Sequence, residues 1–64
     1  MIGLGEKLRA ARKAKRLRQQ DVAEMLNLSR TAYVKYEKDK AEPSLPSFRL
    51  LAEIYGVTME DLLP

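Results

Sequence analysis

Arg30, Thr31 and Lys35 are the residues whose types and spacing best suit recognition of another molecule. At positions i, i+1 and i+5 of a helix their side chains share one outward arc. The planar guanidinium of arginine can donate two hydrogen bonds to adjacent acceptors such as O6 and N7 of guanine, and lysine can donate to guanine or to a phosphate. Threonine offers a hydroxyl and a methyl group, and the methyl group suits thymine. The alternative is that these polar side chains only solvate a surface helix.

Enzymatic chemistry has little support in the composition. The 64 residues include no histidine and no cysteine, which removes the usual metal ligands, the usual general base and the thiol nucleophile. A chain of this length also buries only about 60% of the surface that its unfolded form exposes, so a core and a deep substrate cleft do not both fit. We therefore expect no enzyme, no metal site and no cofactor.

The charged side chains are unevenly distributed along the sequence. Residues 1–20 carry seven basic side chains and one acidic one, residues 21–40 carry four of each, and residues 41–64 carry one basic and four acidic ones. The net charge therefore runs from +6 through zero to −3, which adds up to +3 for the chain. A basic face can meet a polyanion, but it can also be an ordinary solvated helix face, and composition alone leaves both open.

Local signals predict a sharp turn between two short helices. The second helix of the chain is expected over residues 19–26 and the third over residues 30–37. Asn27 tolerates the left-handed backbone conformation that ends one helix sharply, and Ser29 is a good N-cap for the next. Two helices joined by three residues have the geometry of a helix-turn-helix.

Three further helices are expected around this unit. Their signals are apolar residues at helical spacing, serine or threonine N-caps and a terminating glycine. The residues are Leu4, Leu8 and Ala11 in the first helix, Ser44, Pro46, Phe48, Leu51, Ala52, Tyr55 and Gly56 in the fourth, and Thr58, Asp61 and residues 59–63 in the fifth. No strand signal competes, so the sequence predicts one all-α domain of five helices over residues 1–64.

The run from Gln19 to Glu37 resembles the helix-turn-helix of the phage Cro/CI repressor family, also called the XRE family. Later core, turn and cap positions match as well, namely Pro43-Ser44-Leu45, Leu51-Ala52-Glu53, Gly56-Val57-Thr58 and Leu62-Leu63. The resemblance covers the chain from Leu4 onward and implies a lambda-repressor-like fold with the third helix in the major groove of double-stranded DNA. Under this interpretation Arg30, Thr31 and Lys35 contact bases.

The resemblance also implies contacts to DNA phosphates. Gln19 begins the second helix, where family members bind phosphate, and Lys38 and Lys40 resemble a second phosphate-binding region. Arg18 replaces the usual serine or threonine cap before Gln19, a loss worth about 1 kcal/mol of helix stability, but it adds a cation beside the expected phosphate path.

Other positions have a structural role under the same resemblance. Arg12 and Glu37 fall where the family has a buried Arg–Glu ion pair that links the first and third helices. Arg16 stands where a glycine or asparagine commonly ends the first helix, and Asn27 replaces the glycine that is usual at the turn.

Three functions remain open at this stage. The first is a transcription regulator, a repressor foremost, that binds a pseudo-palindromic operator as a homodimer. The second is an antitoxin, which would add a toxin as a protein partner. The third is a helical interaction or RNA-binding module. All four aromatic side chains of the chain are expected in the core, and they are Tyr33, Tyr36, Phe48 and Tyr55. No aromatic side chain is then left on the surface to stack on the bases of single-stranded RNA.

Assembly and location complete the expectations. Met59 and Leu63 are expected to be exposed apolar residues and so are candidates for the homodimer contact, at least on DNA. No apolar stretch approaches the roughly 20 residues of a membrane span. The N-terminus also lacks a signal-peptide hydrophobic region. A narrow, partly alanine apolar stripe makes the first helix a poor membrane-surface helix. We expect a cytoplasmic protein, associated with the nucleoid through DNA.

Overall fold

The computed structural model describes residues 2–64, which form five helices and no strand. The helices are α1 (Leu4–Ala14), α2 (Gln19–Met25), α3 (Arg30–Glu37), α4 (Leu45–Tyr55) and α5 (Met59–Leu62). The all-α prediction is confirmed, and α3 has the predicted bounds. α2 and α5 each end one residue earlier than predicted, because Leu26 and Leu63 act as C-caps. Within the described part of the chain, no helix is long and apolar enough to cross a membrane.

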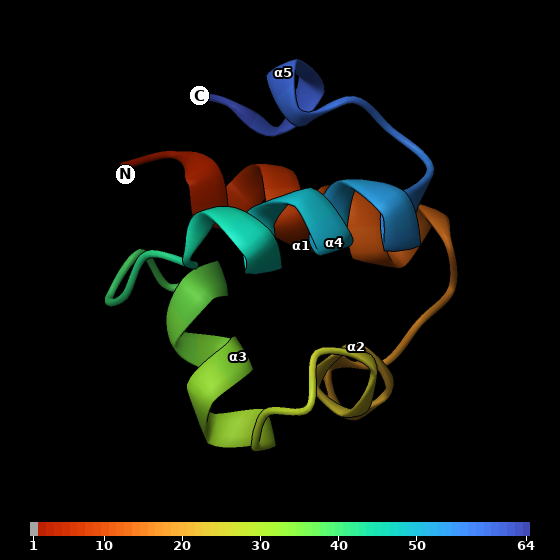
Figure 1. Cartoon of the computed structure of the whole chain (residues 1–64), viewed down its shortest axis with the longest axis vertical. Coiled ribbons are helices and arrows are strands. Elements are labelled where there is room, and N and C mark those ends of the chain that lie inside the picture. Colours follow the sequence, from red (N-terminus) through yellow and green to blue (C-terminus); the bar gives the residue numbers. More distant parts are fainter. Residues whose placement is uncertain (1) are drawn as a thin grey trace.

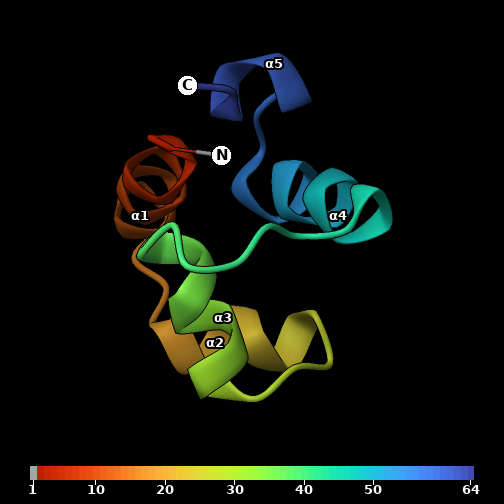
Figure 2. The same cartoon turned by 90° about the vertical axis from the view of Figure 1, so that its left-hand side faces the viewer.

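The helix-turn-helix lies at one end of the molecule. α2 and α3 sit opposite α5, with α1 and α4 between them (Figures 1 and 2). α3 packs on α2 and on α1, while α5 packs on α1 and α4. The three principal extents of the molecule are 24, 23 and 20 Å, so each helix lies near the surface.

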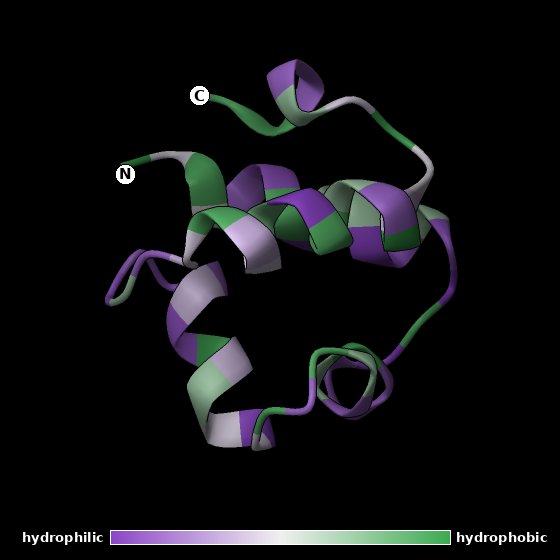
Figure 3. Cartoon of the chain, in the orientation of Figure 1, coloured by the Kyte–Doolittle hydropathy of each residue, from purple (hydrophilic) through white to green (hydrophobic). Residues whose placement is uncertain are grey.

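All five helices contribute to a single core. The buried apolar residues are Leu4, Leu8, Val22, Ala23, Tyr33, Phe48, Leu51, Ala52, Tyr55 and Leu62. Hydrophobic and hydrophilic residues alternate along α1 and α4, as amphipathic helices require (Figure 3). Tyr36 is half-buried against this core. The expectation that Met59 is exposed is wrong, since it is half-buried and also packs on the core, whereas Leu63 is 43% exposed.

The predicted turns and caps have the expected local chemistry. Asn27 adopts the left-handed conformation with φ 57°, and the Ser29 hydroxyl accepts from the amide of Ala32. Arg16 has the same φ of 57°, which explains why glycine or asparagine suits this position in the family that the chain resembles. Thr58 and Asp61 form the predicted capping box at the start of α5.

The start of α1 is held by a residue that the sequence did not single out. Asp39, in the loop after α3, accepts hydrogen bonds from the amides of Gly3 at 3.0 Å and Gly5 at 2.8 Å. These amides belong to the first turn, where an α-helix has no internal acceptors for them. Gly5 is buried there, and a Cβ atom at this position would overlap the carbonyl group of Glu37. The end of α3 can therefore approach α1 closely only because residue 5 is glycine.

Candidate nucleic-acid interface

α3 presents the three residues predicted to contact bases to solvent. Arg30, Thr31 and Lys35 are exposed, whereas Tyr33 on the opposite face is completely buried. Burial of Tyr33 fixes the rotation of α3 about its own axis, because its ring belongs to the core and its hydroxyl contacts that of Tyr55 on α4. The buried face of α3 therefore determines that Arg30, Thr31 and Lys35 point outward.

Side chains from three segments gather beside this face in one open groove. The residues that line the groove are Gln19, Arg30, Thr31, Val34, Lys35, Lys38 and Lys40. Six of the seven residues predicted to contact DNA are thus brought together, and Arg18 is the one that is absent. The lining contains four cationic side chains and no acidic one, so the groove favours a polyanion.

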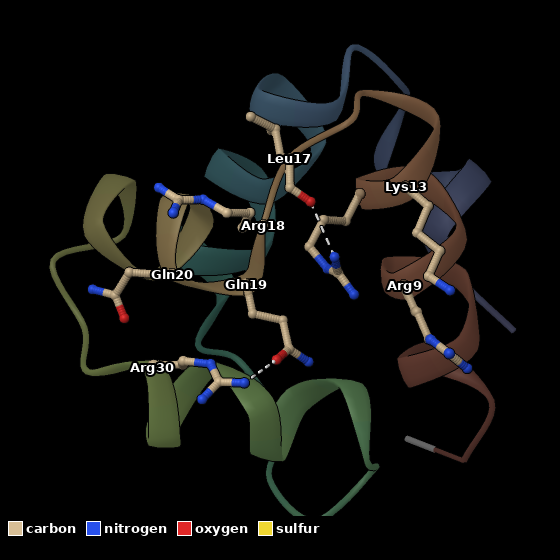
Figure 4. A pocket seen from close by; sticks show the side chains of 8 residues that line it. Arg9, Lys13, Leu17, Arg18, Gln19, Gln20 and Arg30 are labelled. Atoms are coloured by element: carbon tan, nitrogen blue, oxygen red, sulfur yellow. Dashed lines mark hydrogen bonds between the residues drawn. The ribbon is translucent and has the colours of Figure 1, made fainter.

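A second basic hollow lies between α1 and the start of α2 (Figure 4). Its lining residues are Arg9, Arg12, Lys13, Leu17, Arg18, Gln19, Gln20 and Arg30. Gln19 and Arg30 line both hollows, so the two form one continuous basic surface across α1, α2 and α3.

A buried ion pair joins α1 to α3 behind this surface. Arg12 donates from Nε to one carboxylate oxygen of Glu37 at 2.7 Å and from a terminal nitrogen to the other at 3.1 Å. The side chains of Arg12 and Glu37 are only 11% and 4% exposed. A further guanidinium nitrogen of Arg12 donates to the carbonyl oxygen of Leu17 at 3.0 Å, which also fixes the chain between α1 and α2. The structure thus brings together the pair that the resemblance implied.

Glu37 is the centre of a larger polar network. Tyr33 donates its hydroxyl to Glu37 and contacts the hydroxyl of Tyr55, so the network extends into α4. Burial alone would raise the pKa of Glu37, but hydrogen bonds from Arg12, Tyr33 and Gln19 outweigh it and hold the pKa below its ordinary value. Burial raises the pKa of Tyr55 to about 12 and raises the pKa of Tyr33 as well, so both hydroxyls are neutral at neutral pH. No buried side-chain nitrogen or oxygen among residues 2–64 lacks a partner.

Gln19 connects the network to the exposed face of α3. Its side-chain nitrogen donates to Glu37 at 3.2 Å, and its side-chain oxygen accepts from Arg30 at 3.1 Å. Arg30 and Gln19 point toward each other across the mouth of the hollow in Figure 4.

Comparison with known proteins identifies the family to which the chain belongs. A family profile described as "Helix-turn-helix" matches residues 8–62, which is most of the chain. The chain belongs to this helix-turn-helix family. The resemblance to phage-repressor-type domains is thereby confirmed, and α2 and α3 are the two helices of the helix-turn-helix motif.

Similar proteins include several regulators of this helix-turn-helix type. A SPbeta prophage-derived uncharacterised HTH-type transcriptional regulator, YonR of Bacillus subtilis, is 42% identical over 92% of this chain and 55% of its own length. The HTH-type transcriptional activator BcrR of Enterococcus faecalis is 40% identical over 91% of this chain and 28% of its own length. The immunity repressor protein of Bacillus phage phi105 is 32% identical over 94% of this chain and 42% of its own length. The chain thus spans about half or less of these relatives, and no solved structure matches it significantly.

Arg18, the residue before α2 of this helix-turn-helix domain, gives no side-chain cap to the first-turn amides of α2, but it is itself held by Asp21. Asp21 accepts the backbone amide of Arg18 at 2.8 Å and its guanidinium at 2.7 and 3.2 Å. The hydrogen bonds from Arg18 lower the pKa of Asp21 to about 2. The Arg18 side chain is 79% exposed, so this ion pair contributes little to the stability of the fold.

Two cations of α1 were not predicted as part of the site. Arg9 and Lys13 are exposed and line the hollow beside Arg18 and Arg30 (Figure 4). Their spacing of four residues places them on one face of α1, a signal that the sequence did contain. The orientation of that face toward α2, however, follows only from the packing of α1 on α3.

Proposed function

We propose that this domain binds double-stranded DNA sequence-specifically and regulates transcription, with α3 lying in the major groove. The observation that carries the proposal is the arrangement of Arg30, Thr31 and Lys35 on the exposed face of a helix whose opposite face is locked into the core. A helix about 10 Å across fits the major groove, and residues near its N-terminus reach the base edges first. Arg30 and Thr31 are the first two residues of α3.

We propose that the surrounding cations bind the phosphates on either side of that groove. Lys38 and Lys40 follow the C-terminal end of α3, and the cation Arg18, next to the neutral Gln19, lies near its N-terminal end. Cations on both sides of the inserted helix would match two phosphate strands, as major-groove binding requires. The exposed face of α1, with Arg9 and Lys13, extends the same contact.

We propose repression by occupancy as the mode of regulation, with the domain acting as a homodimer on a pseudo-palindromic operator in the cytoplasm. Blocking a promoter needs only the DNA contact described here. Activation would need a second surface for another protein. The immunity repressor among the relatives supports repression, and the activator among them is the alternative that a reporter-gene assay would distinguish.

Salt dependence and selection from random duplexes test the proposal together. We expect selection to return one defined sequence, and log K for it to fall with log[salt] by about 0.9 per phosphate neutralised. Lys38→Ala and Lys40→Ala should each weaken all sequences alike and flatten that slope by about one unit. Lys7→Ala is the matched control, because Lys7 lies on α1 near Asp61 of α5, away from the interface. An affinity that does not change with salt would exclude DNA as the ligand.

A further inference from the structure

The loop after α3 carries one acidic side chain between two of the cations proposed to bind phosphate, in the order Lys38, Asp39, Lys40. Lys38 and Lys40 line the groove beside α3, whereas the carboxylate of Asp39 accepts hydrogen bonds from the amides of Gly3 and Gly5 at the start of α1. Adjacent residues of one loop thus serve two different surfaces. A free carboxylate at this place would repel the phosphates that the lysines attract.

The backbone of this segment has the conformation of a sharp helix end. The amide of Lys40 donates to the carbonyl oxygen of Lys35 at 2.9 Å, and the amide of Asp39 donates to that of Tyr36 at 3.3 Å. These two bonds define a Schellman motif, in which Asp39 occupies the left-handed position with φ 57°. This conformation is costly for most residues other than glycine, but aspartate and asparagine tolerate it better. Asp39 therefore suits this turn.

The side chain of Asp39 ties the turn to another helix. Its two carboxylate oxygens accept from Gly3 at 3.0 Å and from Gly5 at 2.8 Å, and these hydrogen bonds hold the pKa of Asp39 below its ordinary value. The amides at the N-terminus of an α-helix carry partial positive charge, which offsets the negative charge of the carboxylate. Gly5 is itself buried against the end of α3, so the anchor point is fixed. Asp39 can thus hold the loop without opposing a polyanion as a free carboxylate would.

We infer that Asp39 is a positioning residue for phosphate binding, which anchors the loop after α3 to α1 and so holds Lys38 and Lys40 beside the groove; this inference rests on the proposed function. A lysine gains less from a phosphate contact if the backbone that carries it must also be ordered on binding. A loop that is fixed in advance avoids that part of the cost. The effect should be the same for every DNA sequence, because phosphate contacts carry no sequence information.

The test compares Asp39→Asn with Glu60→Gln in the full chain. Asparagine keeps the shape of aspartate and its tolerance of the left-handed conformation, but it has only one acceptor oxygen and sets an NH₂ group against the other amide. Glu60→Gln removes the same charge from an exposed position of α5, at the end of the molecule opposite α2 and α3 (Figure 1). Affinities are measured for the selected duplex and for an unrelated duplex, below the melting temperature of every variant.

Loss of charge and loss of the anchor have opposite effects on binding. If Asp39 acted only as a negative charge beside two lysines, its removal would strengthen DNA binding. We expect instead that Asp39→Asn weakens binding to both duplexes alike, by about three- to tenfold. Glu60→Gln should leave the affinity unchanged or slightly raise it. In a protein that already carries Lys38→Ala and Lys40→Ala, Asp39→Asn should cause no further loss, because the side chains that it positions are gone.

Equal or tighter DNA binding by a folded Asp39→Asn protein would overturn the inference. A loss of the same size in the Lys38→Ala, Lys40→Ala background would also overturn it, since Asp39 would then act through α1 or through stability alone. In the free protein, ¹⁵N relaxation should show larger motion of the Lys38 and Lys40 amides in Asp39→Asn than in the unmodified chain, and equal motion would contradict the anchor. Failure of the proposed function would look different, because the unmodified domain would then bind neither duplex.

Discussion

Glu37 and Arg30 differ in what surrounds them, and this separates folding from recognition. Glu37 is a buried carboxylate with hydrogen bonds from α1, α2 and α3, whereas Arg30 is an exposed guanidinium at the start of α3. Removing one member of a buried pair leaves the other charged and poorly solvated. Removing an exposed side chain leaves the core untouched.

Glu37→Ala should therefore destabilise the fold without acting on recognition directly. We expect a loss of about 3–5 kcal/mol, a large share of what a domain of this size possesses. Arg30→Ala should melt like the unmodified protein but lose about 1–3 kcal/mol of operator binding and its preference at one base pair. Thermal melts and binding curves of both variants make the comparison. An unchanged melt for Glu37→Ala would mean that water reaches the pair and screens it.

At the scale of single residues, the sequence predicts most of the local chemistry. Ser29, Thr58 and Asn27 have their structural roles because each acts on backbone groups within three residues of itself, and such roles can be recognised from spacing alone. The cap that Asp39 gives to Gly3 and Gly5 joins positions 36 and 34 residues apart. No local pattern encodes that pairing, since it depends on where the end of α3 meets α1.

The crossing of α1 and α3 is the contact between elements on which the site most depends. It brings Glu37 to Arg12 and the loop at Asp39 to the first turn of α1, and it turns the face with Arg9 and Lys13 toward α2. Periodicity in the sequence predicted both helices, and the family resemblance predicted the ion pair. Neither predicted how closely the two helices approach each other. Gly5, at the point of contact, carries no side chain whose periodicity could have indicated it.

Gly5→Ala tests the closeness of this crossing. Alanine normally stabilises a helix interior by about 1 kcal/mol relative to glycine. At position 5 the added Cβ would overlap the backbone carbonyl of Glu37, which cannot move aside as a flexible side chain can. We therefore expect destabilisation of about 1–3 kcal/mol, measured by chemical denaturation. A more stable variant would show that the two helices can separate at little cost.

The charges of the whole molecule determine how its stability depends on pH. The pKa values of Asp21, Glu37, Asp39 and Asp61 are all lowered in the fold, each by hydrogen bonds or cations that favour the carboxylate. A group with a lowered pKa stabilises the fold above its unfolded value of about 4 and loses that contribution as the pH falls toward its folded value.

We therefore expect a melting temperature that is nearly constant from about pH 5 to pH 8 and falls steadily below about pH 4. The constant region follows from the absence of histidine, the side chain that ordinarily titrates there. Calorimetric melts at a series of pH values, at fixed ionic strength, provide the measurement. A melting temperature that rises on acidification to about pH 3 would contradict the carboxylate contacts described above.

The size of the molecule bears on how much DNA one copy can cover. Its longest principal extent is 24 Å, and one copy has one helix, α3, in the position proposed to enter the major groove. Successive major grooves on one side of B-DNA are about 34 Å apart. Under the proposed function, one copy would therefore read one half-site, and a second copy would be needed for the next. Leu63, 43% exposed beside the last helix, remains a candidate for contact between the copies, whereas the half-burial of Met59 makes it a weaker one.

We expect two copies to bind an operator of two inverted half-sites whose centres are about one helical turn, or 10–10.5 base pairs, apart. Moving the half-sites apart by five base pairs should reduce affinity, because it places the second copy on the opposite side of the duplex. Restoring a full turn should keep the faces aligned but lengthen the distance that the protein contact must span. Footprinting and band-shift titrations on the three duplexes give the result. A single half-site bound as tightly as the intact operator would show that the domain reads DNA as a monomer.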